Sequence, residues 1–426
     1  MQVSELRRAL LGRVSGIGGS LIMYRALSFS PEAEAQGVLQ TELSWGGLGY
    51  SVPAAEVEQR FPQTTQALKF IGGTSVLVEK IVQSIKDSYL SGKGTVKDLF
   101  EALEGGESLI FCVAFDYEQV VQTPTVGEDG QNDIESFLYC QAQVIYVEPP
   151  AGLGDGGDFR ILYSFPFRVQ YNFRNPASNP KRLSSEFSKN LFANENSLLN
   201  VFKSKVASKK FKEKRFPKAI RVIDVQLTEE FKKTLDFIKI TDRFRSDFVG
   251  NVFSASLSEV GGMSVVPFQA SQLLGITLAQ RFKRDDKILR LASNMGGKDQ
   301  LDYVIGIEMH RLLRKITGEN EANVRIARGM SCFITLRSVA RGNELARVKI
   351  SWITDVVLDR ISFTKNLQAF DLRYMIQIVV LLFDGFVDLV MRGGDAKYEN
   401  LGLKKAQDEK VLLVFKKVFD ECVYES

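Results

Sequence analysis

Three long runs rich in β-branched and aromatic residues place the strongest constraint on the fold of this 426-residue chain. They cover residues 109–121, 136–147 and 158–171, and turn signals separate them. The two connecting stretches, VGEDGQND and GLGDGGD, are acidic and rich in glycine, but neither has the ligand spacing of an EF-hand calcium loop. Runs of this kind are typical of an antiparallel meander. We therefore expect a sheet in the first half whose neighbouring strands follow one another in sequence.

The second half also alternates strands and helices. Residues 219–227 read as a strand, and residues 228–238 as a helix capped by Thr228. The apolar runs 247–257 and 302–309 are predicted to be strands, and residues 330–339 and 345–352 a hairpin. Residues 374–391 predict a buried core helix, and a final amphipathic helix covers residues 408–424.

A basic segment near the middle of the chain separates these halves. Residues 203–221 hold seven Lys and two Arg against one acid, whereas the whole chain has a net charge of only +4. Apolar residues at helical spacing predict an amphipathic helix over residues 197–212, which Pro217 ends. The predicted fold is a mixed α/β fold with two mixed or antiparallel sheets, packed helices, and two halves joined by the basic helical segment. The predicted organisation is a leader or targeting-like segment (1–36), an N-terminal α+β domain (37–185), a linker with the basic helix (186–221) and a C-terminal α/β domain (222–426).

The basic segment is the one electrostatic candidate for a binding site. Its cations attract phosphates or anionic lipid head groups, and because lysine dominates, binding to nucleic acid should be non-specific and salt-sensitive. A solvated surface helix and an assembly contact are the alternative interpretations. The candidate polyanion-binding residues are Lys203, Lys205, Lys209, Lys210, Lys212, Lys214, Arg215 and Lys218.

Histidine usage excludes several kinds of chemistry. The chain has a single histidine, His310, so a zinc site with several histidines cannot be built within one chain. Cationic neighbours, including Arg311 and Arg314, favour a structural role for His310 over that of a base. Asp384 and Asp388 share one helix face and could form a carboxylate pair, but nothing in the sequence supplies a partner, and both disfavour a bilayer span. No catalytic residue, metal ligand or cofactor is predicted.

Four cysteines are spread along the chain without a C-x-x-C pair, which excludes a zinc ribbon or thioredoxin-like motif. Cys112 and Cys140 lie on consecutive predicted strands. A hairpin centred on Val126 would place them opposite each other, where a disulfide could form in an oxidising compartment. Two buried free thiols are the alternative.

The N-terminal 36 residues leave the location of the protein open. Four Arg and one acid precede Pro31, and the small-residue stretch 33–35 resembles a cleavage site, but Arg13 and Arg25 interrupt the apolar core of a signal peptide. Export to an envelope compartment, the cytoplasm and organelle targeting therefore all stay open.

These observations predict a non-enzymatic binding or assembly protein, of the kind found as a bacterial envelope component, with protein partners or a homo-oligomeric state. The alternative is non-specific binding of nucleic acid or an anionic membrane surface through residues 203–221. An enzyme that uses carboxylates, lysine or serine is not excluded.

Overall fold

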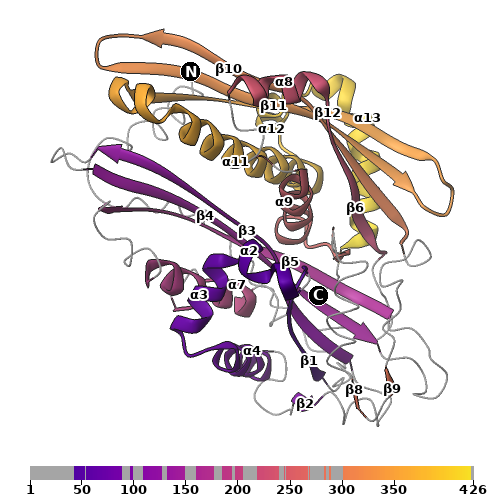
Figure 1. The fold of residues 1–426 in the computed structure, drawn as a ribbon. Helices are drawn as coiled ribbons and strands as arrows, with labels where there is room; N and C mark the ends of the chain where they lie inside the picture. Colours follow the sequence, from indigo (N-terminus) through magenta and orange to yellow (C-terminus); the bar gives the residue numbers. More distant parts are fainter. Residues whose placement is uncertain are drawn as a thin grey trace.

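The protein contains two five-stranded sheets with helices packed on them (Figure 1). The structure is a computed structural model. It describes residues 43–52, 54–88, 96–98, 109–126, 132–148, 160–176, 185–193, 197–204, 218–238, 244, 246–266, 268, 283–284, 287–288 and 301–423. The leader predicted over residues 1–36 lies outside these ranges.

The first sheet has the strand order β2-β1-β3-β4-β5. Its strands are β1 (Leu43–Tyr50), β2 (Val96–Asp98), β3 (Leu109–Val126), β4 (Asn132–Glu148) and β5 (Arg160–Pro176). The predicted meander β3-β4-β5 is confirmed, and its strands are longer than the sequence indicated. Strand β1, which the sequence analysis missed, pairs in parallel with both β2 and β3. A Cβ atom at Gly46 would lie 2.5 Å from Cys112 Sγ, so this bulged position needs glycine.

Short helices cover one face of the first sheet. They are α2 (Val57–Arg60), α3 (Pro62–Phe70), α4 (Thr74–Ser88), η2 (Lys189–Ala193) and α7 (Leu198–Phe202), and a 3₁₀ turn, η1 (Ala54–Glu56), precedes α2. Glu118 of β3, which is remote from α3 in the sequence, caps this helix. Its carboxylate accepts hydrogen bonds from the backbone N–H groups of Gln63 and Thr64 at 2.8 and 2.7 Å. Pro62 at the first helical position has no N–H that would need a partner.

The second sheet has the strand order β12-β11-β10-β6-β7. Its strands are β6 (Ile220–Leu227), β7 (Val265–Val266), β10 (Tyr303–Glu319), β11 (Asn323–Ser338) and β12 (Glu344–Asp359), and a separate small ribbon consists of β8 (Lys283–Arg284) and β9 (Lys287–Ile288). The predicted hairpin between β11 and β12 is confirmed, and Gly342 occupies its turn with a φ of 65°. Strand β10 continues far beyond the predicted residue 309.

The helices of the second half are α8 (Glu229–Phe237), α9 (Ser246–Glu259), α11 (Arg360–Arg392), α12 (Asp395–Asn400) and α13 (Lys405–Cys422). Thr228 caps α8, as predicted, by accepting a hydrogen bond from the Phe231 N–H. The prediction of a strand over residues 247–257 was wrong, since this segment forms α9. Nearly all of α9 is buried, so its residues show no helical alternation of apolar and polar types.

Helices α9 and α11 lie between the two sheets (Figure 1). Phe248 of α9 packs on Tyr117 and Tyr139 of the first sheet, and the same core includes Ile305 and Cys332 of the second sheet. The predicted core helix is therefore confirmed within α11. The mixed α/β fold with two sheets is confirmed as well, and each sheet is built from residues on one side of the basic segment.

Candidate interaction surface on the second sheet

The basic segment is described at its two ends only. Lys203 is exposed just after α7, where Ser197 caps the helix by accepting a hydrogen bond from the Asn200 N–H. Lys218 is engaged, because its Nζ donates to Glu421 at 2.8 Å and to the Tyr303 hydroxyl at 3.1 Å. The other candidate residues, Lys205, Lys209, Lys210, Lys212, Lys214 and Arg215, lie outside the described residues. The structure therefore places only Lys203 as an available cation of this group.

The expectation that Cys112 and Cys140 face each other was wrong. Val126 still belongs to β3, where it pairs with Asn132, and a bulge shifts the register between Phe115 and Tyr117. Cys112 consequently lies opposite Ile145, and Cys140 lies opposite Glu118. Both cysteines are buried thiols outside any disulfide, as are Cys332 and Cys422.

Asp384 and Asp388 of α11 are each engaged in ion pairs. Asp384 accepts from Arg168 Nη2 of β5 at 2.5 Å and from the Ser256 hydroxyl of α9 at 2.6 Å. Asp388 pairs with Arg392 at 2.6 Å and with Lys397 at 2.5 Å. Asp384 thus connects α11 to β5 of the first sheet and to α9. Asp388 connects α11 to Lys397 of α12. These ion pairs give both carboxylates a structural role, and a catalytic role is not needed to explain their presence in the helix.

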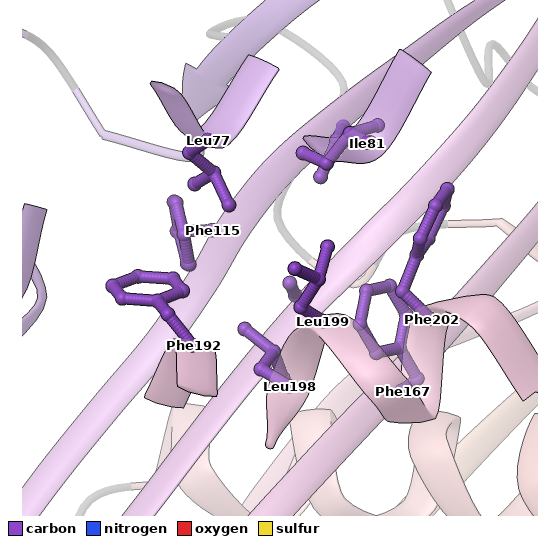
Figure 2. A pocket seen from close by; sticks show the side chains of 10 residues that line it. Leu77, Ile81, Phe115, Phe167, Phe192, Leu198, Leu199 and Phe202 are labelled. Carbon is purple, nitrogen blue, oxygen red and sulfur yellow. The ribbon is translucent and has the colours of Figure 1, made fainter. Parts of the chain in front are cut away.

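An apolar pocket lies under α4 and α7, on the helix-covered face of the first sheet (Figure 2). Leu77, Ile81, Phe192, Leu199 and Phe202 point into it from the helices. Its volume of about 20 Å³ is close to that needed by one water molecule. Because a drug-sized ligand needs about 300 Å³ or more, we interpret this pocket as a packing void rather than a ligand site.

The second sheet has one face that helices α9 and α11 cover and an opposite face, here called the outer face. Alternation along β10, β11 and β12 decides which residues lie on each face. Ile307, Cys332 and Val348 point into the core. The intervening residues point outward, and many of them are exposed. The outer face is the part of the described fold where a long sheet presents large exposed apolar side chains.

A cluster of cations and aromatic rings marks one end of the outer face. Phe333 of β11 lies directly opposite Glu308 of β10 and Lys349 of β12. The Arg347 guanidinium lies 4.6 Å from the centre of the Phe333 ring and pairs with Glu308 at 3.2 Å. The Lys349 ammonium lies 5.4 Å from the same ring, and His310 packs edge-on against it. The one histidine of the chain therefore belongs to this cluster.

Exposed apolar side chains occupy the other end of the outer face. Leu313, Gly329 and Ile353 form one row across the three strands, and Ile353 is 62% exposed. A Cβ atom at Gly329 would lie 2.8 Å from the Ile353 side chain, so this glycine lets Ile353 lie across the middle strand. Val357 is 56% exposed further along β12. Apolar area of this kind next to charged residues is a feature of interaction surfaces.

The outer face also has cations that lack acidic partners. Arg311, Arg325 and Arg347 are paired with Glu230, Asp355 and Glu308. Within the described residues, no ion pair involves Lys315, Arg337 or Lys349, which also point outward. The surface is therefore positive as well as partly apolar. Sequence reasoning missed it because single strands do not reveal which cations share a face with Phe333.

Within the described ranges, no group of three or more His, Cys, Asp or Glu residues could hold a metal ion. One segment, Phe370–Arg392 of α11, is long and apolar enough to cross a membrane by length and composition. Most of it is buried inside the protein, between the two sheets. Its position is that of a core helix.

Comparison with known proteins adds little to this description. No family model matches the chain, and no curated protein matches its sequence significantly. A neuraminyllactose-binding hemagglutinin homolog from Helicobacter pylori aligns at 12% identity and a TM-score of 0.26, covering 49% of this chain and 95% of that one.

Two further solved structures align with parts of the chain. Lipoprotein GNA1162 from Neisseria meningitidis aligns at 12% identity with a TM-score of 0.16, over 38% of this chain and 96% of its own. The hypothetical protein CT253 from Chlamydia trachomatis aligns at 16% identity with a TM-score of 0.20, over 40% and 98%. A binding protein homolog and a lipoprotein are thus among the structures that resemble parts of the chain, and likenesses at these scores establish no function for it.

Proposed function

We propose that this chain is a non-enzymatic binding or assembly protein that engages a partner protein through the outer face of its second sheet. The observation that supports the proposal is the exposed pair Ile353 and Val357 on a long sheet face that also carries Lys349, a cation without an ion pair among the described residues. Leaving such side chains in water forgoes about 1.5–3 kcal/mol each relative to full burial. A partner that covers them would recover part of this free energy.

The size of the outer face fits a specific interface. Strands β10, β11 and β12 are 17, 16 and 16 residues long. At about 4.8 Å between strands and 3.3 Å per residue, the three strands present about 750 Å². A standard protein–protein interface buries about 800 Å² on each partner. The positive charge of the surface calls for a partner that is acidic and partly apolar.

The groups that could have suggested catalysis are engaged elsewhere. His310 packs on Phe333, and Asp384 and Asp388 are both ion-paired. These contacts support an architectural role for them. An envelope location is part of the proposal only through residues 1–36, where the small-residue stretch 33–35 resembles the cleavage site of an export signal.

Site-specific photo-crosslinking in the cells that make the protein tests this function. A photoreactive residue is placed at Ile353, and a matched control is placed at Leu413 of α13, which is 59% exposed against 62% for Ile353. We expect one discrete heavier adduct from position 353 and none from position 413. The adduct should weaken in the Lys349→Glu variant and persist in Lys410→Glu, which changes an exposed lysine of α13. Equal crosslinking at both positions, or none at either, would overturn the proposal.

A further inference from the structure

The two halves of the chain have the same strand topology. In the first sheet the order is β2-β1-β3-β4-β5, and in the second, read from its other edge, it is β7-β6-β10-β11-β12. In each half a first strand is followed by helices, then by a short strand that pairs in parallel with it, and then by a three-stranded meander. The first strand also pairs in parallel with the first meander strand. The two halves therefore share one strand topology, to which the second half adds the β8–β9 ribbon between its short parallel strand and its meander.

This repetition makes the faces of the two sheets equivalent. In each unit the helices that connect the first strand to the meander lie on one face, as a right-handed crossover requires. For the first sheet these are α2, α3 and α4, and for the second they are α8 and α9. The remaining face of the first sheet is covered by α9 and α11 (Figure 1). The corresponding face of the second sheet is the outer face, and none of the helices within the described residues covers it.

The covered face shows what kind of element suits such a sheet. Arg168 projects from β5, the third meander strand, and meets two helix acids: Asp384 of α11 at 2.5 Å and Glu259 of α9 at 3.5 Å. Tyr139 of β4, the middle meander strand, packs against Phe248 of α9. The strands supply a cation and an aromatic ring, and the helices supply carboxylates and apolar side chains.

The outer face presents the same chemistry in the same places. Its third meander strand, β12, supplies Arg347 and Lys349, and its middle strand, β11, supplies Phe333. Resting on the function proposed above, we infer that the occupant of the outer face is an acidic amphipathic helix of a partner protein. The helix takes the place that α9 and α11 take on the first sheet.

The spacing on β12 defines the pattern of that helix. Arg347 and Lys349 are two residues apart and therefore about 6.6 Å apart along the strand. Carboxylates at positions i and i+4 of a helix are about 6 Å apart, which matches this spacing. Ile353 and Val357 continue in the same direction, so the partner helix carries its acids in one half and its apolar residues in the other.

A pair of synthetic peptides tests this inference on the full chain. Both are helical, about 24 residues long, with leucines at helical spacing in the second half. One has two Glu at i and i+4 in the first half, and the other has Lys at the same positions. We expect the Glu peptide to bind at least tenfold more tightly by fluorescence anisotropy, and the difference to shrink as salt is raised.

Protein variants make the test specific to the outer face. Lys349→Glu, which removes a cation without an ion pair, should reduce the preference for the Glu peptide several-fold. The matched change Lys410→Glu should leave the preference unaltered. Circular dichroism should confirm that both variants are folded. Equal binding of the two peptides, or the same loss in both variants, would overturn the inference.

The remaining outcomes separate this inference from the proposed function. Crosslinking at Ile353 combined with no preference between the peptides would leave the function standing and exclude an acidic helix. If light scattering shows a dimer that Lys349→Glu dissociates and that neither peptide competes with, the occupant is a second copy of the chain, and the inference is wrong. Absence of both crosslinks and peptide binding would overturn function and inference together.

Discussion

The ion-pair network around Arg168 should be essential for the stability of the whole protein. The Arg168 side chain is 7% exposed. Its guanidinium donates to Asp384 at 2.5 Å, to the Val252 carbonyl at 3.1 Å and to the Ser256 hydroxyl at 3.2 Å. Its backbone N–H donates to Glu259 at 2.6 Å. One residue of β5 thereby joins the first sheet to both helices of the middle layer.

The Arg168→Met variant keeps most of the apolar stem and removes the charge. Asp384 would then lie in the protein interior without its cation. Removing one partner of a buried pair typically costs about 3–5 kcal/mol. We expect the free energy of unfolding to fall by about that amount, which is a large part of the usual 5–15 kcal/mol.

Urea denaturation followed by circular dichroism measures this loss. The matched control is Arg325→Met, because Arg325 pairs with Asp355 at 2.9 Å but both side chains are more than 40% exposed. The control should change stability by less than about 1 kcal/mol. If Arg168→Met also stays within 1 kcal/mol of the wild type, the layers are not held by this pair and the reasoning fails. Arg168→Met combined with Asp384→Leu should recover part of the loss, since the second change removes the carboxylate that Arg168→Met leaves without its cation.

Three further predictions concern the first sheet and the thiols. Burial raises the pKa of Asp116 to about 8, so the folded state holds a proton that the unfolded state releases near pH 4. The free energy of unfolding should therefore decrease as pH rises from about 4 to 8. In urea titrations at a series of pH values, the Asp116→Asn variant should show a smaller decrease than the wild type; the same decrease in both proteins would contradict this. Phe202 is buried beside the small pocket, so Phe202→Ala should lower the free energy of unfolding by about 3–5 kcal/mol. A melting temperature within a few degrees of the wild type would contradict this and would show that neighbouring side chains fill the space. Burial raises the pKa of the Cys140, Cys332 and Cys422 thiols, so mass spectrometry should find no alkylation of the native chain and four modified cysteines after unfolding. A disulfide between Cys112 and Cys140 in the native protein would refute the register of β3 and β4.

Sequence patterns predicted the elements far better than their registers. The meander of the first sheet could be read from three runs, each with a strong β composition and its own turn signals. Helix α9 could not be recognised, because a helix enclosed by two sheets has no polar face and so no period. A continuous apolar run of that length is compatible with either a strand or a buried helix.

Bulges explain why the site was missed. Cys112 and Cys140 were expected to face each other, but the bulge at Asp116 and a turn placed beyond Val126 moved them apart. The pairing of Phe333 with Lys349 depends in the same way on a register shift between Leu336 and Arg337. A one-residue slip exchanges the two faces of a strand. Composition could therefore show that cations and aromatic residues are present, but not that they share the outer face.

The contacts between layers give a physical reason to expect acids on the partner. Among the described residues, the ion pairs that join α11 to the strands form three junctions, one around each of three acids. At two of them strands supply arginine and the helix supplies the acid: Arg168 with Asp384, and both Arg328 and Arg314 with Asp371 at 2.8 and 3.3 Å. The third junction is reversed, since Arg373 of α11 meets Glu135 of β4.

Helix α11 takes part in all three junctions. One helix therefore forms ion pairs with both sheets, and these pairs help to set how the two sheets stack. The outer face offers Lys315 and Lys349 in the same manner, and within the described residues neither forms an ion pair with a helix acid. A partner helix with carboxylates would extend the alternation of sheets and helices by one layer. A partner helix with lysines would be repelled by Lys349 and Lys315, so charge selects the partner and the apolar row of Leu313 and Ile353 provides the affinity.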